Sequence, residues 1–358
     1  MIDDEQPSLA VVRLAPLLDH ALLPVQGPPG SGKTYAGARM IADLVARGQR
    51  VGVTGPSHKV ITGLLDGLVE YTNQNSRTLR IMQKSDKEQA CAHGSVTCTN
   101  DNGVIVSALK AKTVDVVAGT SWLFSRDDMA GQLDVLVIDE AGQTSLADTL
   151  AVSPSAQSMV LLGDPQQLGQ PGAATHPDGV DVSALDHLLA GNATISPKLG
   201  VLLSDTWRMH PTICAWVSDT FYDSRLHPVP GLEHQRIDTS ASDKNELLGA
   251  GLSWRPVEHE GRRNRSPEEA AEVARIVDEL LEATWTDQYG NNRKMTVEDI
   301  LVVAPYNAHV AAIRAVVPPE LPSAPWTSSK AAKRPPPSTR WPAAPPTTSP
   351  AALSSSTR

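Results

Sequence analysis

Residues 27–34 have the types and the spacing of a loop that binds phosphate groups. They match the pattern G-x-x-x-x-G-K-[ST] with Gly27, Pro28, Pro29, Gly30, Ser31, Gly32, Lys33 and Thr34. Glycines let the main chain wrap a phosphate with its N–H groups, and a helix that begins there adds a positive dipole. Lys33 is predicted to reach the β- and γ-phosphates and Thr34 to ligate Mg²⁺, so we expect ATP and Mg²⁺ as ligands. An accidental glycine-rich turn is the alternative.

Two acidic residues follow an apolar run and could supply the other half of such a site. Val135–Ile138 is apolar and is followed by Asp139 and Glu140. Parallel sheets bind ligands at the carboxyl ends of their strands. Asp139 is therefore predicted to hold Mg²⁺, and Glu140 to orient or deprotonate the attacking water. A solvated pair of acids at a strand end is the alternative, which the phosphate-binding loop makes less attractive.

Short apolar runs that alternate with helical stretches would position these residues. The expected strands are Leu22–Gln26, Arg50–Thr54, Thr113–Ala118, Asp134–Asp139 and Met159–Gly163. The expected helices are Tyr35–Arg47 and Val60–Tyr71. Strands that are apolar on both faces and separated by helices predict an α/β fold, with a doubly wound parallel sheet covered by helices on both faces.

A second block is expected from about residue 200 to residue 317. Ser266, Pro267 and the two glutamates after them have the order of a helix start, and Ala270, Val273, Ala274, Val277 and Leu281 follow as its buried stripe. A strand over Asp299–Ala304 and a helix over Asn307–Val317 come next. Residues 318–358 include 11 prolines and eight serines, a composition that predicts disorder.

The overall composition excludes several classes of protein. The net charge of −9 gives no global basic field, so any site for a polyanion must be local. The apolar runs are far shorter than the ~18 residues of a membrane span, and the acidic N-terminus does not resemble a secretory signal. Three cysteines fit a reducing cytoplasm, where we expect the protein, without a membrane partner. Cys91, His93 and Cys98 are three soft ligands without an evident fourth, which favours an ordinary polar loop over a zinc site.

Five segments in this order resemble the motifs of superfamily 1 helicases. They read GPPGSGKT (27–34), DEAGQ (139–143), GDPQQL (163–168), TWRMHP (206–211) and APYNAHV (304–310). The group that contains the nonsense-mediated-decay RNA helicase and the replication flap nuclease–helicase is the most similar. The sequences of these motifs are also similar to those of bacterial proteins in which a RecB-like nuclease is joined to such a motor. The resemblance implies a P-loop NTPase with a RecA-like sheet in residues 1–199 and a partial second RecA-like domain in residues 200–317.

The resemblance also assigns roles to individual residues. It implies that Gln167 senses the γ-phosphate and that Arg208 is an arginine finger, for which an interdomain salt bridge is the alternative. It implies that the single strand is contacted by Thr54, Ser57, His58, Lys59 and Thr120. A plain polar loop is the alternative for these last residues. Single-stranded DNA or RNA is the implied partner, together with a RecB-like nuclease module that this chain does not contain.

The family continues beyond APYNAHV with a segment resembling Thr-Val-Asp-Lys-Phe-Gln-Gly, which is not found here. The codons of residues 324–331, read in another frame, permit that segment, so we hypothesise a frameshift near Leu321, which resequencing tests. We therefore expect an ATP-dependent helicase or translocase whose hydrolysis in this chain is reduced at least ~10³-fold. The alternatives are an ATP-binding remnant without helicase activity and a non-helicase P-loop enzyme such as a small-molecule kinase.

Overall fold

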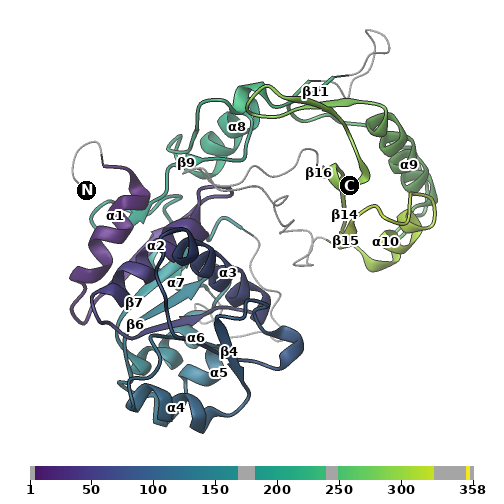
Figure 1. The fold of residues 1–358 in the computed structure, drawn as a ribbon. Helices are drawn as coiled ribbons and strands as arrows, with labels where there is room; N and C mark the ends of the chain where they lie inside the picture. The colour runs from purple at the N-terminus through teal and green to yellow at the C-terminus, as the bar shows by residue number, and fades with distance from the viewer. Residues whose placement is uncertain (1–4, 168–181, 239–248, 326–351, 355–358) are drawn as a thin grey trace. The chain divides into compact units, whose positions relative to one another are not determined.

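The computed structural model describes residues 5–167, 182–238, 249–325 and 352–354 and divides into two compact units (Figure 1). The first unit comprises Met1–Thr206 and Val217–His227, and the second comprises Trp207–Trp216 and Pro228–Arg358. The sequence-based boundary was placed near residue 200. The first unit extends further because residues 201 and 202 form a strand of its main sheet.

A parallel sheet of eight strands, counted over the described residues, forms the middle of the first unit. Its strand order is β4-β3-β5-β2-β6-β7-β1-β8, and neighbouring strands are parallel throughout. The strands are β1 (Leu22–Gln26), β2 (Val51–Thr54), β3 (Ile81–Lys84), β4 (Val96–Thr99), β5 (Val116–Ala118), β6 (Leu133–Asp139), β7 (Ala156–Gly163) and β8 (Val201–Leu202). The predicted doubly wound α/β fold is confirmed.

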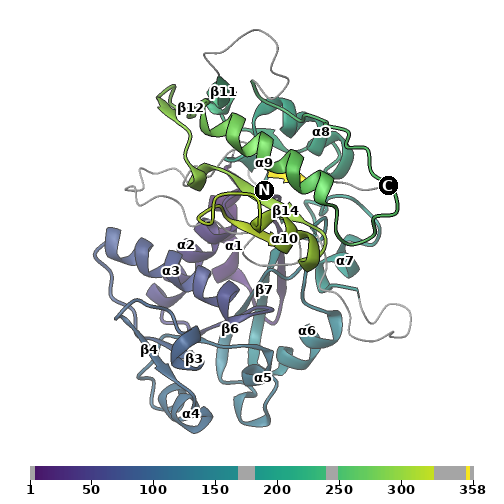
Figure 2. The same ribbon diagram turned by 90° about the vertical axis from the view of Figure 1, so that its right-hand side faces the viewer.

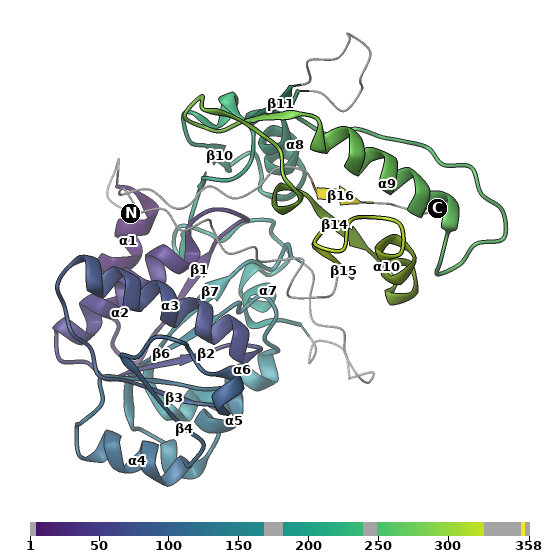
Figure 3. The same cartoon turned by 45° about the vertical axis from the view of Figure 1, so that its right-hand side comes forward.

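Helices cover both faces of this sheet (Figures 2 and 3). One face packs against α1 (Pro7–Leu14), α2 (Lys33–Ala46) and α3 (His58–Gln74). The other packs against α4 (Asn102–Lys110), α5 (Ser121–Phe124), α6 (Leu146–Val152) and α7 (Ala184–Leu189). Because both faces are covered, the central strands are apolar on both sides, which is why their sequences read as continuous apolar runs.

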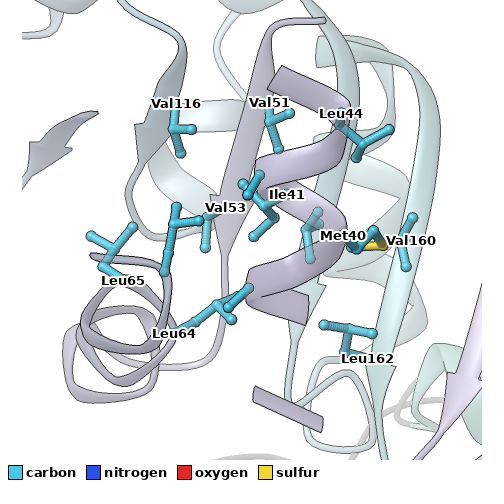
Figure 4. Close-up of a cluster of buried hydrophobic side chains, with 14 of the residues drawn as sticks. Met40, Ile41, Leu44, Val51, Val53, Leu64, Leu65, Val116, Val160 and Leu162 are labelled. Atoms are coloured by element: carbon cyan, nitrogen blue, oxygen red, sulfur yellow. The ribbon is translucent and has the colours of Figure 1, made fainter. Parts of the chain in front are cut away.

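An apolar core lies beneath α2, on the face of the sheet that α3 also covers. Met40, Ile41 and Leu44 point from α2 between the side chains of β2, β7 and α3 (Figure 4). Each of the three is fully buried. Their spacing of one, three and four residues places them on one helical face, as expected for an amphipathic helix. The start of α2 at Lys33 is therefore fixed by the packing behind it.

Three strands of this sheet were not predicted from the sequence: β4 and β8 lie at its edges, and β3 lies next to β4. β3 alternates buried and half-buried residues, β4 has one buried residue, and β8 has only two residues. None of them shows the continuous apolar run of a strand covered on both faces. The central strands, in contrast, were predicted with bounds within three residues of those observed.

The second unit contains two small sheets and two packed helices. The antiparallel sheet is β11 (Arg236–Asp238), β12 (Thr284–Thr286) and β13 (Asn292–Lys294). In the other, β14 (Leu301–Ala304) lies between β15 (Ser323–Pro325) and β16 (Ala352–Ser354), both parallel to it. The helices α9 (Pro267–Leu281) and α10 (Asn307–Arg314) pack in one apolar cluster with β14. The Ser266 side chain caps α9 by accepting a hydrogen bond from the N–H of Glu269, as predicted.

The remaining elements are short or join the two units. They are α8 (Pro211–Phe221), β9 (Asp205–Thr206), β10 (His227–Pro228) and the single 3-10 turns Ala15–Leu17, Lys87–Gln89, Asp127–Met129, Ser153–Ser155, Leu232–His234 and Val297–Asp299. No helix in the described part of the chain is long and apolar enough to cross a membrane.

The expectation of disorder from residue 318 onward is corrected for two stretches. Leu321 is buried in the apolar cluster of the second unit, and β15 and β16 pair with β14. The tail composition is polar on average. Leu321, however, is buried in the same apolar cluster as Val317, four residues before it, and this ties the first residues of the tail to a core. Residues 326–351 and 355–358, and with them most of the proposed frameshifted segment, lie outside the described residues.

Candidate nucleotide-binding and catalytic site

The loop of residues 27–34 lies between β1 and α2, at the carboxyl edge of the main sheet. The N–H of Gly27 donates to the carbonyl oxygen of Gly163 at 2.8 Å, which ties the end of β1 to the end of β7. Gly30 and Gly32 have φ angles of +76° and +80°, in the left-handed region that favours glycine. The main chain therefore turns sharply twice before α2 begins at Lys33, as a loop that encircles a phosphate must.

The Lys33 side chain folds back over this loop. Its Nζ donates to the carbonyl oxygen of Gly27 at 2.6 Å. A Cβ atom at Gly27 would lie 2.2 Å from Cγ of Lys33, so only glycine leaves room for the lysine stem. The Ser31 hydroxyl is buried and has no hydrogen-bond partner among the described residues. A loop that holds an ammonium and an unpaired hydroxyl fits the oxygen atoms of a phosphate group.

Asp139 lies in line with this loop across three neighbouring strands. In the register of the sheet, Asp139 pairs with Leu162 of β7, and Leu162 pairs with Val25 of β1. Two strand spacings separate the Cα atoms of Asp139 and Val25, or about 10 Å. Asp139 is buried at the end of β6. A carboxylate at this position can share one small cation with a phosphate in the loop.

Glu140 has a strained backbone. Its φ is +53°, a left-handed conformation that costs a non-glycine residue about 1–3 kcal/mol. The turn is held by its N–H, which donates to Oδ1 of Asp139 at 2.9 Å, and by its carbonyl oxygen, which accepts from the N–H of Gln143 at 2.8 Å. The strain turns the chain immediately after Asp139 and leaves the Glu140 side chain only half-buried at the sheet edge.

Two glycines bring the turns after β6 and β7 into direct backbone contact. A Cβ at Gly142 would lie 2.4 Å from the carbonyl oxygen of Asp164, and a Cβ at Gly163 would lie 2.6 Å from the nitrogen of Gly142. The N–H of Ala141 donates to the carbonyl oxygen of Leu162 at 2.8 Å. This close approach explains the glycine in each of the two motifs, for which the sequence provided no physical reason.

Gln167 belongs to a buried hydrogen-bond network that the sequence did not reveal. Its Nε2 donates to Oδ2 of Asp164 at 3.1 Å, and the hydroxyl of Tyr222, just after α8, donates to the same oxygen at 2.7 Å. Asp164 is 1% exposed and Tyr222 is 2% exposed. Burial and the nearby Asp164 raise the pKa of Tyr222, so its hydroxyl keeps its proton. Asp164 and Tyr222 therefore hold the side chain that is predicted to read the γ-phosphate. Leu168, the last residue of that motif, lies outside the described residues.

The TWRMHP segment begins on the phosphate-binding loop. The hydroxyl of Thr206, which is fully buried, donates to the carbonyl oxygen of Pro29 at 3.0 Å. Arg208, two residues later, belongs to the second unit, and its side chain is exposed. The contact of Thr206 joins residues 177 positions apart and had no local signal in the sequence.

The residues expected to contact a single strand follow β2 and β5, which are neighbours in the sheet. Thr54 is buried at the end of β2, and Ser57 caps α3 by accepting a hydrogen bond from the N–H of Val60. His58 is half-buried, and burial lowers its pKa. Lys59 is exposed, and Thr120 precedes α5. The structure thus brings the loops together but commits the Ser57 hydroxyl to a helix cap and leaves Thr54 inside the sheet.

The thiols of Cys91 and Cys98 each donate a hydrogen bond to an oxygen atom. The thiol of Cys91 donates to Oδ1 of Asp66 at 3.1 Å, and the thiol of Cys98 donates to the carbonyl oxygen of Ser85 at 3.1 Å. Within the described ranges, no group of three or more His, Cys, Asp or Glu side chains is arranged to hold a metal ion.

Comparisons with known proteins find relatives for both halves of the chain. Two family profiles, each described as an AAA domain, match residues 9–177 and residues 180–325. The "DNA polymerase alpha-associated DNA helicase A" of Schizosaccharomyces pombe is 23% identical over 82% of this chain and 51% of its own length. The "DNA replication ATP-dependent helicase/nuclease JHS1" of Arabidopsis thaliana is 24% identical over 86% of this chain and 23% of its own. Both halves of the chain are thus similar to helicases of superfamily 1.

The chain spans about half or less of the length of these curated relatives. Its first unit has the P-loop, RecA-like α/β fold expected from the sequence. Among solved structures, the arterivirus nonstructural protein 10 helicase in complex with DNA matches with 17% identity and a TM-score of 0.40, over 62% of this chain and 43% of that chain.

Proposed function

We propose that this chain is the motor part of an ATP-dependent helicase or translocase that acts on single-stranded DNA or RNA. The observation that carries the proposal is the alignment of Asp139 with the phosphate-binding loop, beside the paired turns that hold Glu140 and Gln167. Similarity to two relatives that are named as helicases supports it.

Thr34 and Asp139 would hold the Mg²⁺ ion. Both offer the hard oxygen ligands that this ion prefers, and Thr34 is exposed at the start of α2. When bound, the ion neutralises charge on the phosphate oxygens. Lys33 exchanges the carbonyl oxygen of Gly27 for a phosphate oxygen, since a charge-assisted hydrogen bond is the stronger of the two. The glycines and Ser31 supply the remaining donors of the loop.

Glu140 and Gln167 act on the attacking water and on the γ-phosphate. Glu140 takes a proton from the water, to which its half-buried side chain is accessible. Gln167 donates its amide N–H to the γ-phosphate once the nucleotide is bound, and Asp164 accepts that N–H when it is not. The side chain thus has one hydrogen-bond partner for each state.

Arg208 stabilises the charge that develops on the phosphoryl group. Two peptide units span at most about 7 Å, so the Cα of Arg208 lies within that distance of the Cα of Thr206, which contacts Pro29 of the loop. A guanidinium beside the transferred phosphoryl group, an arginine finger, is worth about 10³–10⁵ in rate.

The single strand is held at the loops after β2 and β5, through Ser57, His58, Lys59 and Thr120, with Thr54 beneath them. Residues 228–317 act as part of a second RecA-like domain. A RecB-like nuclease module is the proposed protein partner, supported by the relative named as a helicase and nuclease. Free cysteines support a cytoplasmic location.

Turnover of ATP by the purified chain tests this proposal. We expect Lys33→Ala to lower turnover about 10²–10³-fold, whereas Lys110→Ala, an exposed lysine of α4, leaves it unchanged. We expect Arg208→Ala to lower turnover while nucleotide affinity stays within a few-fold, which a small-molecule kinase would not require. Equal turnover of the Lys33→Ala and unchanged chains would refute the proposal. Stimulation by a single-stranded oligomer would support a motor and contradict the expected impairment. Turnover without stimulation would support an ATP-binding remnant.

A further inference from the structure

The indole of Trp122 is the most exposed large apolar side chain of the described residues, at 84%. The two residues after it, Leu123 and Phe124, are each 1% exposed and belong to the core beneath the sheet. The ring is therefore held outward on a short helix that is itself firmly anchored. A single exposed apolar residue is common on protein surfaces, so its meaning depends on what surrounds it.

The surroundings of Trp122 follow from the order of the strands. Ala118 at the end of β5 is level with Val53 of β2 on one side and with Gln83 of β3 on the other. The N–H of Gly119 donates to the carbonyl oxygen of Val53 at 3.0 Å. A Cβ at Gly119 would be 3.4 Å from Cβ of Lys84. The segment that carries Trp122 therefore leaves the sheet between the loop after β2 and the end of β3.

Cations and hydroxyls are gathered along this edge. Lys59 follows β2 and is exposed, Lys84 ends β3, and Thr120 and Ser121 directly precede the indole. His58 is close enough to Lys84 and Asp86 for both charges to act on its pKa, after the larger effect of burial. Acidic residues also lie near this edge: Asp86 accepts a hydrogen bond from the amide of Asn100 at 2.6 Å, and Asp128, which follows α5, is paired with Arg126.

We infer that Trp122 stacks on a base of single-stranded nucleic acid. The inference rests on the proposed function and adds a contact to a base, where the other residues of this edge contact phosphates. Hydroxyls and ammonium groups hold a backbone without reading its sequence, and an aromatic ring between them accepts the face of any base. A protein partner would instead use an apolar patch. Leu150 of α6, which packs against α5, is also exposed, but Lys59, Thr120 and Ser121 at the strand-end side of the ring favour nucleic acid.

This contact is separate from the site of ATP. In the strand order, β5 is separated from β1 by β2, β6 and β7. Four strand spacings amount to about 19 Å between the strands that carry Trp122 and the phosphate-binding loop. Removal of the indole is therefore expected to change nucleic-acid affinity and leave ATP affinity unchanged.

Binding of labelled oligomers to the full chain tests the inference at one fixed salt concentration. The probes are oligothymidylate, oligouridylate and an abasic deoxyribose–phosphate oligomer of equal length, which keeps the charges and lacks the bases. We expect Trp122→Ala to lower affinity for both base-containing oligomers about 5- to 150-fold, and to leave affinity for the abasic oligomer within twofold. Trp122→Phe is expected to recover most of the loss.

Trp254→Ala is the matched control, because that indole is also exposed and lies in the second unit. Urea unfolding of Trp122→Ala and its ATP affinity show whether the variant is folded. Unchanged affinity for the thymidylate and uridylate oligomers would overturn the inference alone, and so would an equal loss on the abasic oligomer. If the unchanged chain binds ATP but none of the oligomers, the nucleic-acid part of the proposed function fails and the stacking contact fails with it.

Discussion

The hydrogen bond from Tyr222 to Asp164 can be removed without changing the shape of the side chain. Tyr222→Phe deletes one hydroxyl that lies 2.7 Å from Oδ2 of Asp164. Both residues are almost fully buried, so water cannot easily replace the lost donor. A hydrogen bond to a carboxylate contributes about 1.5–3 kcal/mol, and a buried acceptor that loses its donor costs a similar amount. We therefore expect the free energy of unfolding to fall by about 1.5–3 kcal/mol.

The same change is expected to affect catalysis through Gln167. The amide of Gln167 and the Tyr222 hydroxyl share one oxygen of Asp164. Without the hydroxyl, that oxygen binds the glutamine amide more tightly, so more of the γ-phosphate contact is lost. We expect kcat for ATP to fall while the dissociation constant of ATP stays within a few-fold, because the loop that binds the nucleotide is untouched.

Urea unfolding followed by circular dichroism, and single-turnover hydrolysis of ATP, measure the two effects. Tyr289→Phe is the control, since that ring is 64% exposed, and it is expected to change stability by less than about 0.5 kcal/mol. Equal stability of the Tyr222→Phe and unchanged chains would show that the hydroxyl is not bound to Asp164. A weaker ATP affinity with unchanged kcat would show that the network does not act through Gln167.

Three further predictions concern other parts of the chain. Glu140→Gly removes the left-handed strain and is expected to raise the free energy of unfolding by about 0.5–1 kcal/mol. The same change is expected to lower turnover about 10²–10⁴-fold, because the carboxylate is lost. A variant less stable in urea than the unchanged chain would show that the Glu140 backbone is not strained. Burial, with a contribution from Asp66, raises the pKa of Cys91 to about 11. At pH 8 we therefore expect iodoacetamide to alkylate Cys91 about 100-fold more slowly than in the urea-unfolded chain. Equal rates would contradict the raised pKa. Although burial acts to raise the pKa of Asp134, hydrogen bonds from Arg50 lower it below its ordinary value. Asp134→Asn is therefore expected to cost about 1–2 kcal/mol at pH 7, and because a lowered pKa stabilises only above it, the cost shrinks as the pH falls below about 4; a cost independent of pH would contradict the ion pair.

The parts of the site that are local in sequence could be predicted, and those that depend on distant contacts could not. Gly27–Thr34 and Asp139 carry their own signals, because a phosphate-binding loop and an acid after an apolar strand are short patterns. The bond between Tyr222 and Asp164 joins residues 58 positions apart, and neither residue is unusual on its own. Ser57 shows a further limit, since it was not predicted from the sequence that its hydroxyl also caps a helix by accepting from the N–H of Val60.

The same division holds for the fold. β1 was predicted with its observed bounds because its neighbours and covering helices require apolar residues on both faces. β15 was not predicted, because its place beside β14 depends on pairing across the second unit and on the burial of Leu321. A proline-rich composition describes the average of the tail and gives no information about one buried leucine within it.

The mutual contact of Gly142 and Gly163 limits which amino acids these two positions can accept. Each glycine is needed because the backbone of the other turn occupies the space of its side chain. A single substitution at either position must push the two turns apart, and no replacement at the second position can make room for it. Natural variation and directed evolution should therefore leave both positions untouched, and any displacement that a nucleotide causes at one turn is transmitted to the other.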